Sequence, residues 1–254
     1  MMRLFDTHAH MLDKRFDEDR EQLIAQMPKD GVVGVIEVGC CMDVSARAAA
    51  LAQEHDYIYA AVGVHPHDSE DVSGNYISEL EELAKHKKVI AIGEIGLDYY
   101  YDNSPRDVQR KVFEQQIVLA EKLGLPMIFH MRSSTADMLS ILQEHKGIRG
   151  VMHCYSGSVE TAMICLGLGL HISFTGSVTF KNARKVVDAA AAVPLNRIMA
   201  ETDCPYLSPE PKRGRRNDPR NVEHVLAKLA EIKDVTFEQM CEINIENAKG
   251  LYGI

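Results

Sequence analysis

Short apolar runs alternate with longer helical patterns along all 254 residues of the chain, and this alternation restricts the fold more than any other feature. Several of the runs are almost continuous in valine and isoleucine, which is typical of strands buried on both faces of a parallel sheet. The predicted strands are residues 3–6, 31–38, 57–63, 89–95, 126–131, 149–154, 170–176 and 197–202. The sequence therefore predicts an α/β protein.

Helical patterns fill the segments between these runs. Residues 106–123 carry apolar side chains at helical spacing and end at "KLGLP", and a later helix places one apolar face on Val222, Val225, Leu226, Leu229 and Ile232. Eight strand-then-helix units in this length predict a (β/α)8 TIM barrel, although an open doubly wound sheet shares the same alternation. No linker or shift in composition interrupts the chain, so residues 1–254 are expected to form a single domain.

Charge and composition exclude several classes of protein. The formal net charge of −9 argues against a surface that binds nucleic acid everywhere, but "PKRGRRNDPR" concentrates positive charge at Lys212, Arg213, Arg215, Arg216 and Arg220. No apolar stretch approaches the ~18 residues of a membrane span. Asp6 and His8 interrupt the first apolar run before a signal-peptide core forms, which predicts a cytoplasmic protein. The six cysteines lack metal or disulfide spacing, so reduced thiols in packing positions are expected.

Polar residues gather where the predicted strands end. These residues are His8, His10, His65, His67, Glu94, Asp98, His130, Arg132, His153, Glu201 and Asp203. Catalytic residues of a (β/α)8 barrel lie at the carboxyl ends of its strands. An isolated His-x-His pair is more simply a pair of loop histidines, but six of the eleven histidines fall at strand ends. This pattern indicates a functional site.

The residue types point to divalent metal ions. Four imidazoles and two carboxylates, without a thiolate set, suit zinc, manganese or magnesium. Two ions that share these ligands, with a bridging carboxylate and a metal-activated water, are the simplest interpretation. Glu94 is the natural bridge because its strand is expected midway round the barrel between the strands that end in His8 and His10 and those that end in His130 and His153. The alternative is a surface or capping carboxylate, and the apolar run "VIAIGEIGL" argues against it because a buried charge needs a strong partner. Cys154 and Cys204 adjoin proposed ligands and are expected to pack rather than bind metal.

The succession of motifs resembles the TatD-type metal-dependent hydrolases, also called TatD deoxyribonucleases, of the amidohydrolase superfamily. It comprises "DTHAHML", "GVHPHD", "GEIGLDYY", "LPMIFHMR", "HCYSG", "SFTG", "ETDCPYL" and "PKRGRRNDP", and it continues to "NAKGLYGI" at the end of the chain. The resemblance implies a barrel with a two-metal site. It assigns His8, His10 and Asp203 to one ion, His130 and His153 to the other, and Glu94 to the bridge, with Glu94 and Asp203 as catalytic residues.

The resemblance also implies roles around the ligands. His65 contacts substrate phosphate, assists proton transfer or supports a ligand, and Glu201 orients the ligands. Arg132 contacts substrate, although "SST" follows it where the family usually has a small and an acidic residue. The basic run lies beyond the eighth strand, where loops above a barrel mouth are expected, and a contact with the DNA backbone is predicted for Arg213, Arg215 and Arg216.

A phosphodiester is the substrate class that best uses two cations, because they neutralise its non-bridging oxygens and stabilise the leaving oxygen. The leading hypothesis is a 3′–5′ exodeoxyribonuclease that acts on single-stranded DNA. The resemblance also includes proteins linked to D-aminoacyl-tRNA deacylation, so a deacylase or another ester hydrolase is the alternative. A metal-stabilised barrel that binds nucleic acid without turnover is the alternative outside enzymes. DNA is the expected partner as substrate, with no membrane and no obligate protein partner.

Overall fold

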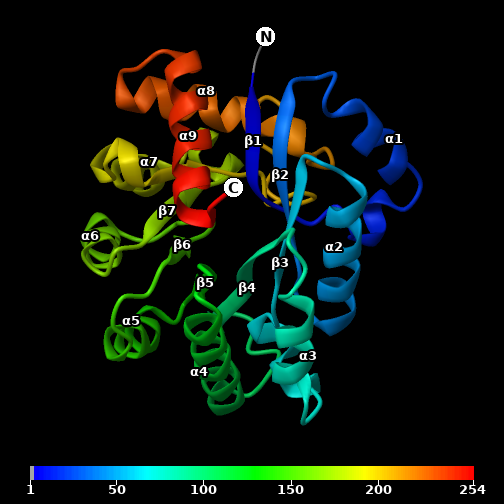
Figure 1. Cartoon of the computed structure of the whole chain (residues 1–254). Coiled ribbons are helices and arrows are strands. Elements are labelled where there is room, and N and C mark those ends of the chain that lie inside the picture. Colours follow the sequence, from blue (N-terminus) through cyan, green and yellow to red (C-terminus); the bar gives the residue numbers. More distant parts are fainter. Residues whose placement is uncertain (1–2) are drawn as a thin grey trace. The chain divides into compact units, whose positions relative to one another are not determined.

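All eight predicted strands are present in the computed structural model, which describes residues 3–254 (Figure 1). They are β1 (Leu4–Ala9), β2 (Val32–Val38), β3 (Ile58–Val62), β4 (Val89–Asp98), β5 (Met127–Arg132), β6 (Gly150–Met152), β7 (His171–Phe174) and β8 (Ile198–Ala200). Parallel pairing joins β1 to β2, β3 to β4, β4 to β5, β5 to β6 and β7 to β8. In each of these five pairs, strands that follow one another in the chain are neighbours.

Each strand is followed by a helix. The α-helices are α1 (Arg20–Gln26), α2 (Met42–Glu54), α3 (Tyr76–Leu83), α4 (Arg106–Leu123), α5 (Thr135–Glu144), α6 (Val159–Gly167), α7 (Arg184–Ala192), α8 (Val222–Lys233) and α9 (Phe237–Tyr252). Helix α4 has the predicted bounds and ends at Gly124, whose φ of 66° is the left-handed conformation that glycine adopts without strain. Helix α8 buries four of its five predicted apolar residues, and Ile232 is half-buried.

The chain divides into two compact units. The first unit holds the chain up to Glu37 together with Cys154–Leu166 and His171–Ile254, and thus contains β7, β8, β1 and most of β2. Within it the ends of β1 and β8 are joined, because the Asp203 N–H donates to the His8 carbonyl (2.9 Å) and the His10 N–H donates to the Cys204 carbonyl (2.8 Å). In a closed barrel the first strand pairs with the last strand. In an open doubly wound sheet, two strands at opposite edges do not meet.

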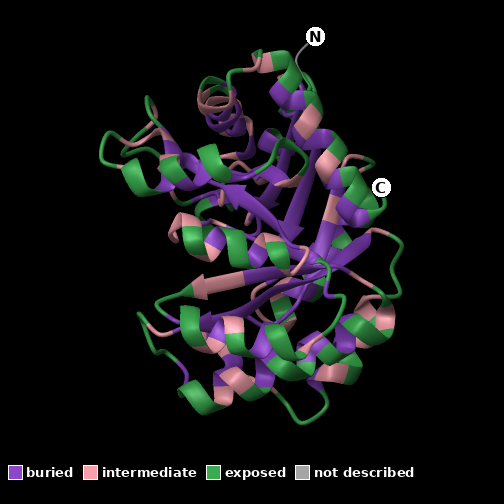
Figure 2. Cartoon of the chain, turned by 90° about the vertical axis from the view of Figure 1, so that its left-hand side faces the viewer, coloured by how far each residue is buried: buried purple, intermediate pink, exposed green. Residues whose placement is uncertain are grey.

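The second unit, Val38–His153 with Gly167–Leu170, contains β3 to β6 in parallel order. Strand β4 is buried along all ten residues. Figure 2 shows the strands mostly in the colour of buried residues, while the helices alternate between buried and exposed positions. Helix α4 packs on β5 through Phe113 and Phe129, whose ring centroids lie 6.0 Å apart at right angles. The near-continuous apolar strands predicted from the sequence therefore form the core.

Two buried glutamines on α4 hold the strand ends of the second unit in place. Gln116 accepts a hydrogen bond from the Val64 N–H (2.8 Å) and donates to the Val64 carbonyl (3.0 Å), just before His65. Gln109 accepts from the Asp98 N–H (2.9 Å) and donates to the Asp98 carbonyl (3.1 Å). Because a side-chain amide offers both a donor and an acceptor, each glutamine satisfies both backbone groups of one buried residue.

The six cysteines are free thiols in the structure. Cys165, Cys204 and Cys241 are buried, and the other three are partly exposed. Among residues 3–254, no helix combines the length and the apolar character needed to cross a bilayer.

The replacement Gln116→Leu is expected to lower the free energy of unfolding by about 2–4 kcal/mol, because the Val64 N–H and carbonyl then lose their buried partners. Urea unfolding followed by circular dichroism measures the change. Val118→Ala is the matched control on the same helix, since Val118 is 56% exposed and should alter stability by less than about 0.5 kcal/mol. Equal unfolding midpoints for the two variants would contradict the role assigned to Gln116.

Candidate metal centre

A buried carboxylate surrounded by imidazoles forms the centre of the second unit. Glu94 on β4 is 3% exposed, and its Oε1 lies 2.7 Å from His130 Nδ1, 2.7 Å from His153 Nε2 and 3.5 Å from His65 Nε2. His130 belongs to β5, His153 follows β6 and His65 follows β3. Parallel pairing places these strand ends side by side, so residues far apart in the sequence converge as the strand-end pattern predicted.

The electrostatics of this cluster keep Glu94 ionised. Burial alone raises the pKa of the Glu94 carboxyl, but the neighbouring His153, His65 and His130 outweigh burial and hold the pKa well below its ordinary value. For His130, burial lowers the pKa, while hydrogen bonds with Asp98 and Glu94 raise it, and the net shift is upward. The cluster therefore presents an anionic oxygen to several ring nitrogens.

Asp98 orients the histidines of this cluster. Its Oδ2 lies 3.1 Å from His130 Nε2 and 3.0 Å from His67 Nε2, while its Oδ1 accepts hydrogen bonds from the N–H groups of Tyr100 (2.9 Å) and Tyr101 (3.0 Å). Burial raises the pKa of Asp98, but these hydrogen bonds dominate and lower it strongly. The ionised carboxylate accepts only, so His130 Nε2 carries a proton and Nδ1 is the nitrogen turned toward Glu94.

His65 has a different arrangement from the other histidines near Glu94. The backbone N–H of His67 donates to His65 Nδ1 (3.1 Å), which leaves the proton of the neutral ring on Nε2, the nitrogen that faces Glu94. Burial, above all, lowers the pKa of His65 well below its ordinary value, so the ring is neutral near pH 7. His65 thus turns an N–H toward Glu94 and offers no lone pair on that side.

The first unit carries a second cluster of donor atoms. His8 Nε2 and His10 Nε2 lie 3.0 Å apart, and Asp203 Oδ1 lies 3.8 Å from the former and 3.5 Å from the latter. The two imidazoles project together from the end of β1, as their spacing of two residues predicted. Asp203 has a φ of 55°, a left-handed conformation that aspartate tolerates better than most residues.

Two buried carboxylates, Asp6 and Glu37, hold the backbone next to the first-unit cluster. Neither was among the predicted site residues. Asp6 is fully buried and accepts hydrogen bonds from the Thr202 N–H and hydroxyl, which fixes the residue before Asp203. Glu37 accepts from the N–H groups of Met11 and Leu12, directly after His10. Burial raises the pKa of Glu37 to about 7. The sequence signal for Glu37 was a lone carboxylate inside the apolar run "GVVGVIEV".

The structure gives Glu201 and Arg132 specific positions. Glu201 is buried, and its Oε1 accepts the N–H of Cys154 (2.7 Å), so it fixes the turn that follows β6.

Arg132 ends β5 and lies over two tyrosine rings, with its Cζ 4.2 Å from the Tyr100 centroid and 4.7 Å from the Tyr101 centroid. The Cys154 thiol lies 3.8 Å from the Thr175 hydroxyl, and Cys204 is fully buried and donates its backbone N–H to the Thr202 hydroxyl (3.2 Å).

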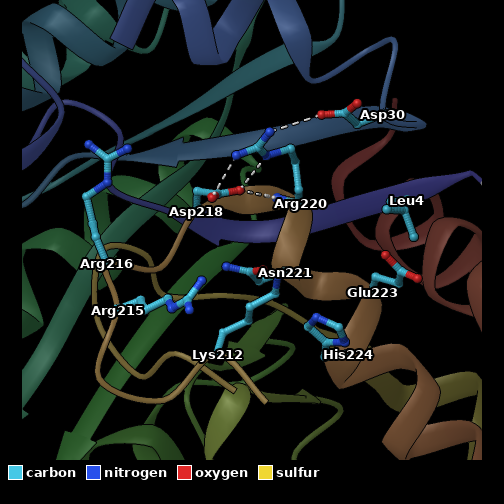
Figure 3. A pocket seen from close by; sticks show the side chains of 10 residues that line it. All are labelled: Leu4, Asp30, Lys212, Arg215, Arg216, Asp218, Arg220, Asn221, Glu223 and His224. Atoms are coloured by element: carbon cyan, nitrogen blue, oxygen red, sulfur yellow. Dashed lines mark hydrogen bonds and ion pairs between the residues drawn. The ribbon is translucent and has the colours of Figure 1, made fainter. Parts of the chain in front are cut away.

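Two of the five basic residues of the run form ion pairs with carboxylates, and Figure 3 shows those of Arg220 with Asp218 and Asp30. Both terminal nitrogens of Arg216 bind the Asp19 carboxylate at 2.7 and 2.6 Å, and Arg220 pairs with Asp218 (2.8 Å) and Asp30 (3.1 Å). Arg216 thus binds Asp19 in the segment after β1, while Arg220 binds Asp30, which lies just before β2. The predicted phosphate contact of Arg216 competes with an existing bidentate ion pair.

The other basic residues of the run, Lys212, Arg213 and Arg215, are more available to bind a ligand. Lys212 and Arg215 line a cavity of about 460 Å³, and within residues 3–254 the structure records no carboxylate partner for either side chain (Figure 3). Arg213 packs over Phe180, with its Cζ 3.9 Å from the ring centroid. Of the three arginines predicted to contact substrate, Arg213 and Arg215 therefore keep their hydrogen-bond donors free of ion pairs.

The donor sets of both units fit a divalent metal ion. In the second unit, Glu94 Oε1 lies 2.7 Å from both His130 Nδ1 and His153 Nε2, so one carboxylate oxygen and two ring nitrogens converge. If His130 is neutral, a lone pair on its Nδ1 faces a carboxylate oxygen 2.7 Å away, and this contact requires a cation or a proton between the two atoms. Mixed imidazole and carboxylate donors are those that zinc and manganese accept.

Comparisons with known proteins agree with this chemistry. A sequence model of the family described as TatD related DNase matches residues 5–253. The uncharacterized metal-dependent hydrolase YabD of Bacillus subtilis is 44% identical over 99% of each chain. The 3′-5′ ssDNA/RNA exonuclease TatD of Pectobacterium parmentieri is 31% identical and covers 98% of this chain and 99% of its own. The crystal structure of YJJV, a TatD homologue from Escherichia coli K12, matches with a TM-score of 0.93 at 30% identity, covering 99% of this chain and 98% of its own.

The protein is therefore a metal-dependent hydrolase with the (β/α)8 fold, and the predicted fold class and enzyme class are confirmed. It belongs to the TatD family.

The replacement Asp98→Asn is expected to weaken binding of Mn²⁺ or Zn²⁺ about 10- to 100-fold, because the carboxylate that fixes the ring and the proton of His130 is lost. Isothermal titration of metal-stripped protein measures the affinity. Asp102→Asn is the matched control, because Asp102 is an exposed carboxylate that pairs with Arg106. Unchanged metal affinity in Asp98→Asn would contradict the orienting role.

Proposed function

We propose that the protein is a 3′–5′ exonuclease that acts on single-stranded DNA with two divalent ions. Its ligands are assigned as the family resemblance implies, with His8, His10 and Asp203 at one ion, His130 and His153 at the other, and Glu94 as the bridge. The two units then form one catalytic domain over residues 1–254. The exonuclease name of the Pectobacterium relative and its similarity over nearly the whole chain support this activity.

The observation that carries the proposal is the contact of one Glu94 oxygen with ring nitrogens of His130 and His153 at 2.7 Å each. A carboxylate has enough lone pairs to serve two ions, whereas each imidazole nitrogen serves one. Bound divalent ions would supply charge to stabilise the phosphoryl oxygens and would lower the pKa of a water. No other side chain of the second-unit cluster described above offers an ionised oxygen toward both imidazoles.

The remaining residues hold the ligands and the substrate in this proposal. Asp98 keeps the proton on His130 Nε2, and Gln116 and Gln109 fix the chain beside His65 and at Asp98. His65 donates its Nε2 hydrogen bond to Glu94 or to a phosphate oxygen. Exonucleolytic hydrolysis adds the water oxygen to phosphorus and breaks the bond from phosphorus to O3′. The O3′ takes a proton, and a 5′-mononucleotide leaves.

The replacement Glu94→Gln is expected to reduce release of nucleotides from the 3′ end by more than about 100-fold, because the amide cannot supply an anionic oxygen to two ions. The assay uses a 5′-labelled single-stranded oligonucleotide and protein stripped of metal, then resupplied with Mg²⁺, Mn²⁺ or Zn²⁺. Glu121→Gln is the control, because Glu121 lies on the surface, where its Oε1 is 3.0 Å from His145 Nδ1. If the wild type leaves the oligonucleotide intact with every ion, the exonuclease proposal is wrong, and D-aminoacyl-tRNA esters become the substrates to test.

The replacement Arg215→Ala is expected to raise KM for the oligonucleotide about fivefold or more, because one charge-assisted hydrogen bond to phosphate is removed. The slope of log affinity against log salt should fall by about 0.7 for each phosphate of a single strand that the protein no longer neutralises. Lys122→Ala, which removes an exposed cation paired with Glu81, should change neither quantity. An unchanged salt slope in Arg215→Ala would exclude Arg215 from the DNA-binding surface.

A further inference from the structure

Two tyrosines in the turn that follows β4 are unusually exposed. Tyr100 is 63% exposed and Tyr101 is 54% exposed, although both carry large apolar rings. Their ring centroids lie 4.9 Å apart at an interplanar angle of 87°. The preceding Tyr99 differs, because its hydroxyl donates to Asp137 (2.7 Å) and its ring is covered by Arg106. Within residues 3–254, the structure records no hydrogen bond for the hydroxyl of Tyr100 or Tyr101, so their rings face solvent without a polar anchor.

A cation completes this surface. The guanidinium of Arg132, at the end of β5, lies 4.2 Å from the Tyr100 centroid and 4.7 Å from the Tyr101 centroid. Contact with the π-faces restricts the guanidinium in position, while its N–H groups still have donors to offer to a ligand. We refer to Tyr100, Tyr101 and Arg132 as the aromatic platform.

Asp98 connects the aromatic platform to the second-unit cluster formed by Glu94, His130, His153 and His65. One oxygen of Asp98 holds the N–H groups of Tyr100 and Tyr101, and the other meets His130 and His67. A single imidazole, that of His67, lies between the two features, with its ring centroid 5.4 Å from Tyr101 and 6.3 Å from His130. The orientation of the tyrosine turn and that of the His130 ring therefore depend on the same carboxylate.

We infer that the aromatic platform is a base-stacking subsite for an unpaired nucleotide next to the hydrolysed phosphodiester. Exposed aromatic rings bind bases by stacking without regard to sequence, because every base has a π-face. Arg132 adds a planar cation that can donate to the phosphate of the same nucleotide. The bases of a duplex are stacked on one another, so only an unpaired strand can place a base on these rings. The inference rests on the proposed exonuclease activity and names the feature that restricts it to single strands.

The test compares bases and tyrosines in one set of assays. One probe is a 5′-labelled oligothymidylate of about ten nucleotides, within the range of known single-strand sites. The second probe has the same length and charge, but its 3′-terminal nucleotides are abasic tetrahydrofuran residues. The proteins are the wild type, a Tyr100→Ala/Tyr101→Ala variant and a Tyr100→Phe/Tyr101→Phe variant. Both tyrosines are exposed, so neither pair of changes removes core packing.

Stacking predicts that the alanine variant raises KM for the thymidylate probe about 5- to 150-fold for each base that no longer stacks on the platform. The phenylalanine variant should keep the wild-type KM, because it keeps the rings. The abasic probe should bind the wild type and the alanine variant equally weakly. If the wild type hydrolyses both probes with equal KM, or if the alanine variant keeps its KM for thymidylate, the platform is not a stacking subsite although the exonuclease activity stands. If the wild type neither binds nor hydrolyses either probe, the proposed function itself fails and this inference fails with it.

Discussion

The buried carboxylate of Glu94 is the constraint on which the second unit depends. An ionised carboxylate that is 3% exposed costs several kcal/mol unless positive or hydrogen-bonding partners surround it. The partners come from three other chain segments, after β3, on β5 and after β6, so the strands must end in register for the contacts at 2.7 Å to form. Gln109 and Gln116 serve this requirement, because each fixes the backbone at a strand end rather than filling the core. Stability and site geometry are therefore linked at the same residues.

A similar logic organises the first unit. His8, His10 and Asp203 bring three donor atoms together, and buried carboxylates hold the backbone on either side of them. Asp6 fixes Thr202, next to Asp203, and Glu37 fixes the two residues after His10. In both units, therefore, candidate metal donors lie at strand ends, and buried polar side chains hold the chain next to them. This is the arrangement that ligand sites need, because outer hydrogen bonds set ligand orientation and basicity.

The sequence predicted most of the fold and the positions of the donor residues, because both follow from local patterns. Helix α4 has the bounds that its apolar spacing indicated, and His8 with His10 project together as a period of two requires. Side-chain contacts between residues far apart in the sequence were not predictable in the same way. Nothing next to Arg216 in the sequence indicates its ion pair with Asp19, and the position of Arg132 over Tyr100 depends on how β4 and β5 pair. The contacts of Asp98 with His130 and His67 also depend on the fold, although the sequence did predict that Asp98 lies at a strand end.

Metal reconstitution measured against activity tests the central claim most directly. Metal-stripped protein receives increasing molar equivalents of Mn²⁺, and release of 5′-mononucleotides from the 3′ end of single-stranded DNA is recorded at each step. A two-ion site bridged by Glu94 predicts that activity is absent without metal and reaches its maximum at about two equivalents per chain. Full activity in the stripped protein, or saturation at a single equivalent, would contradict the account.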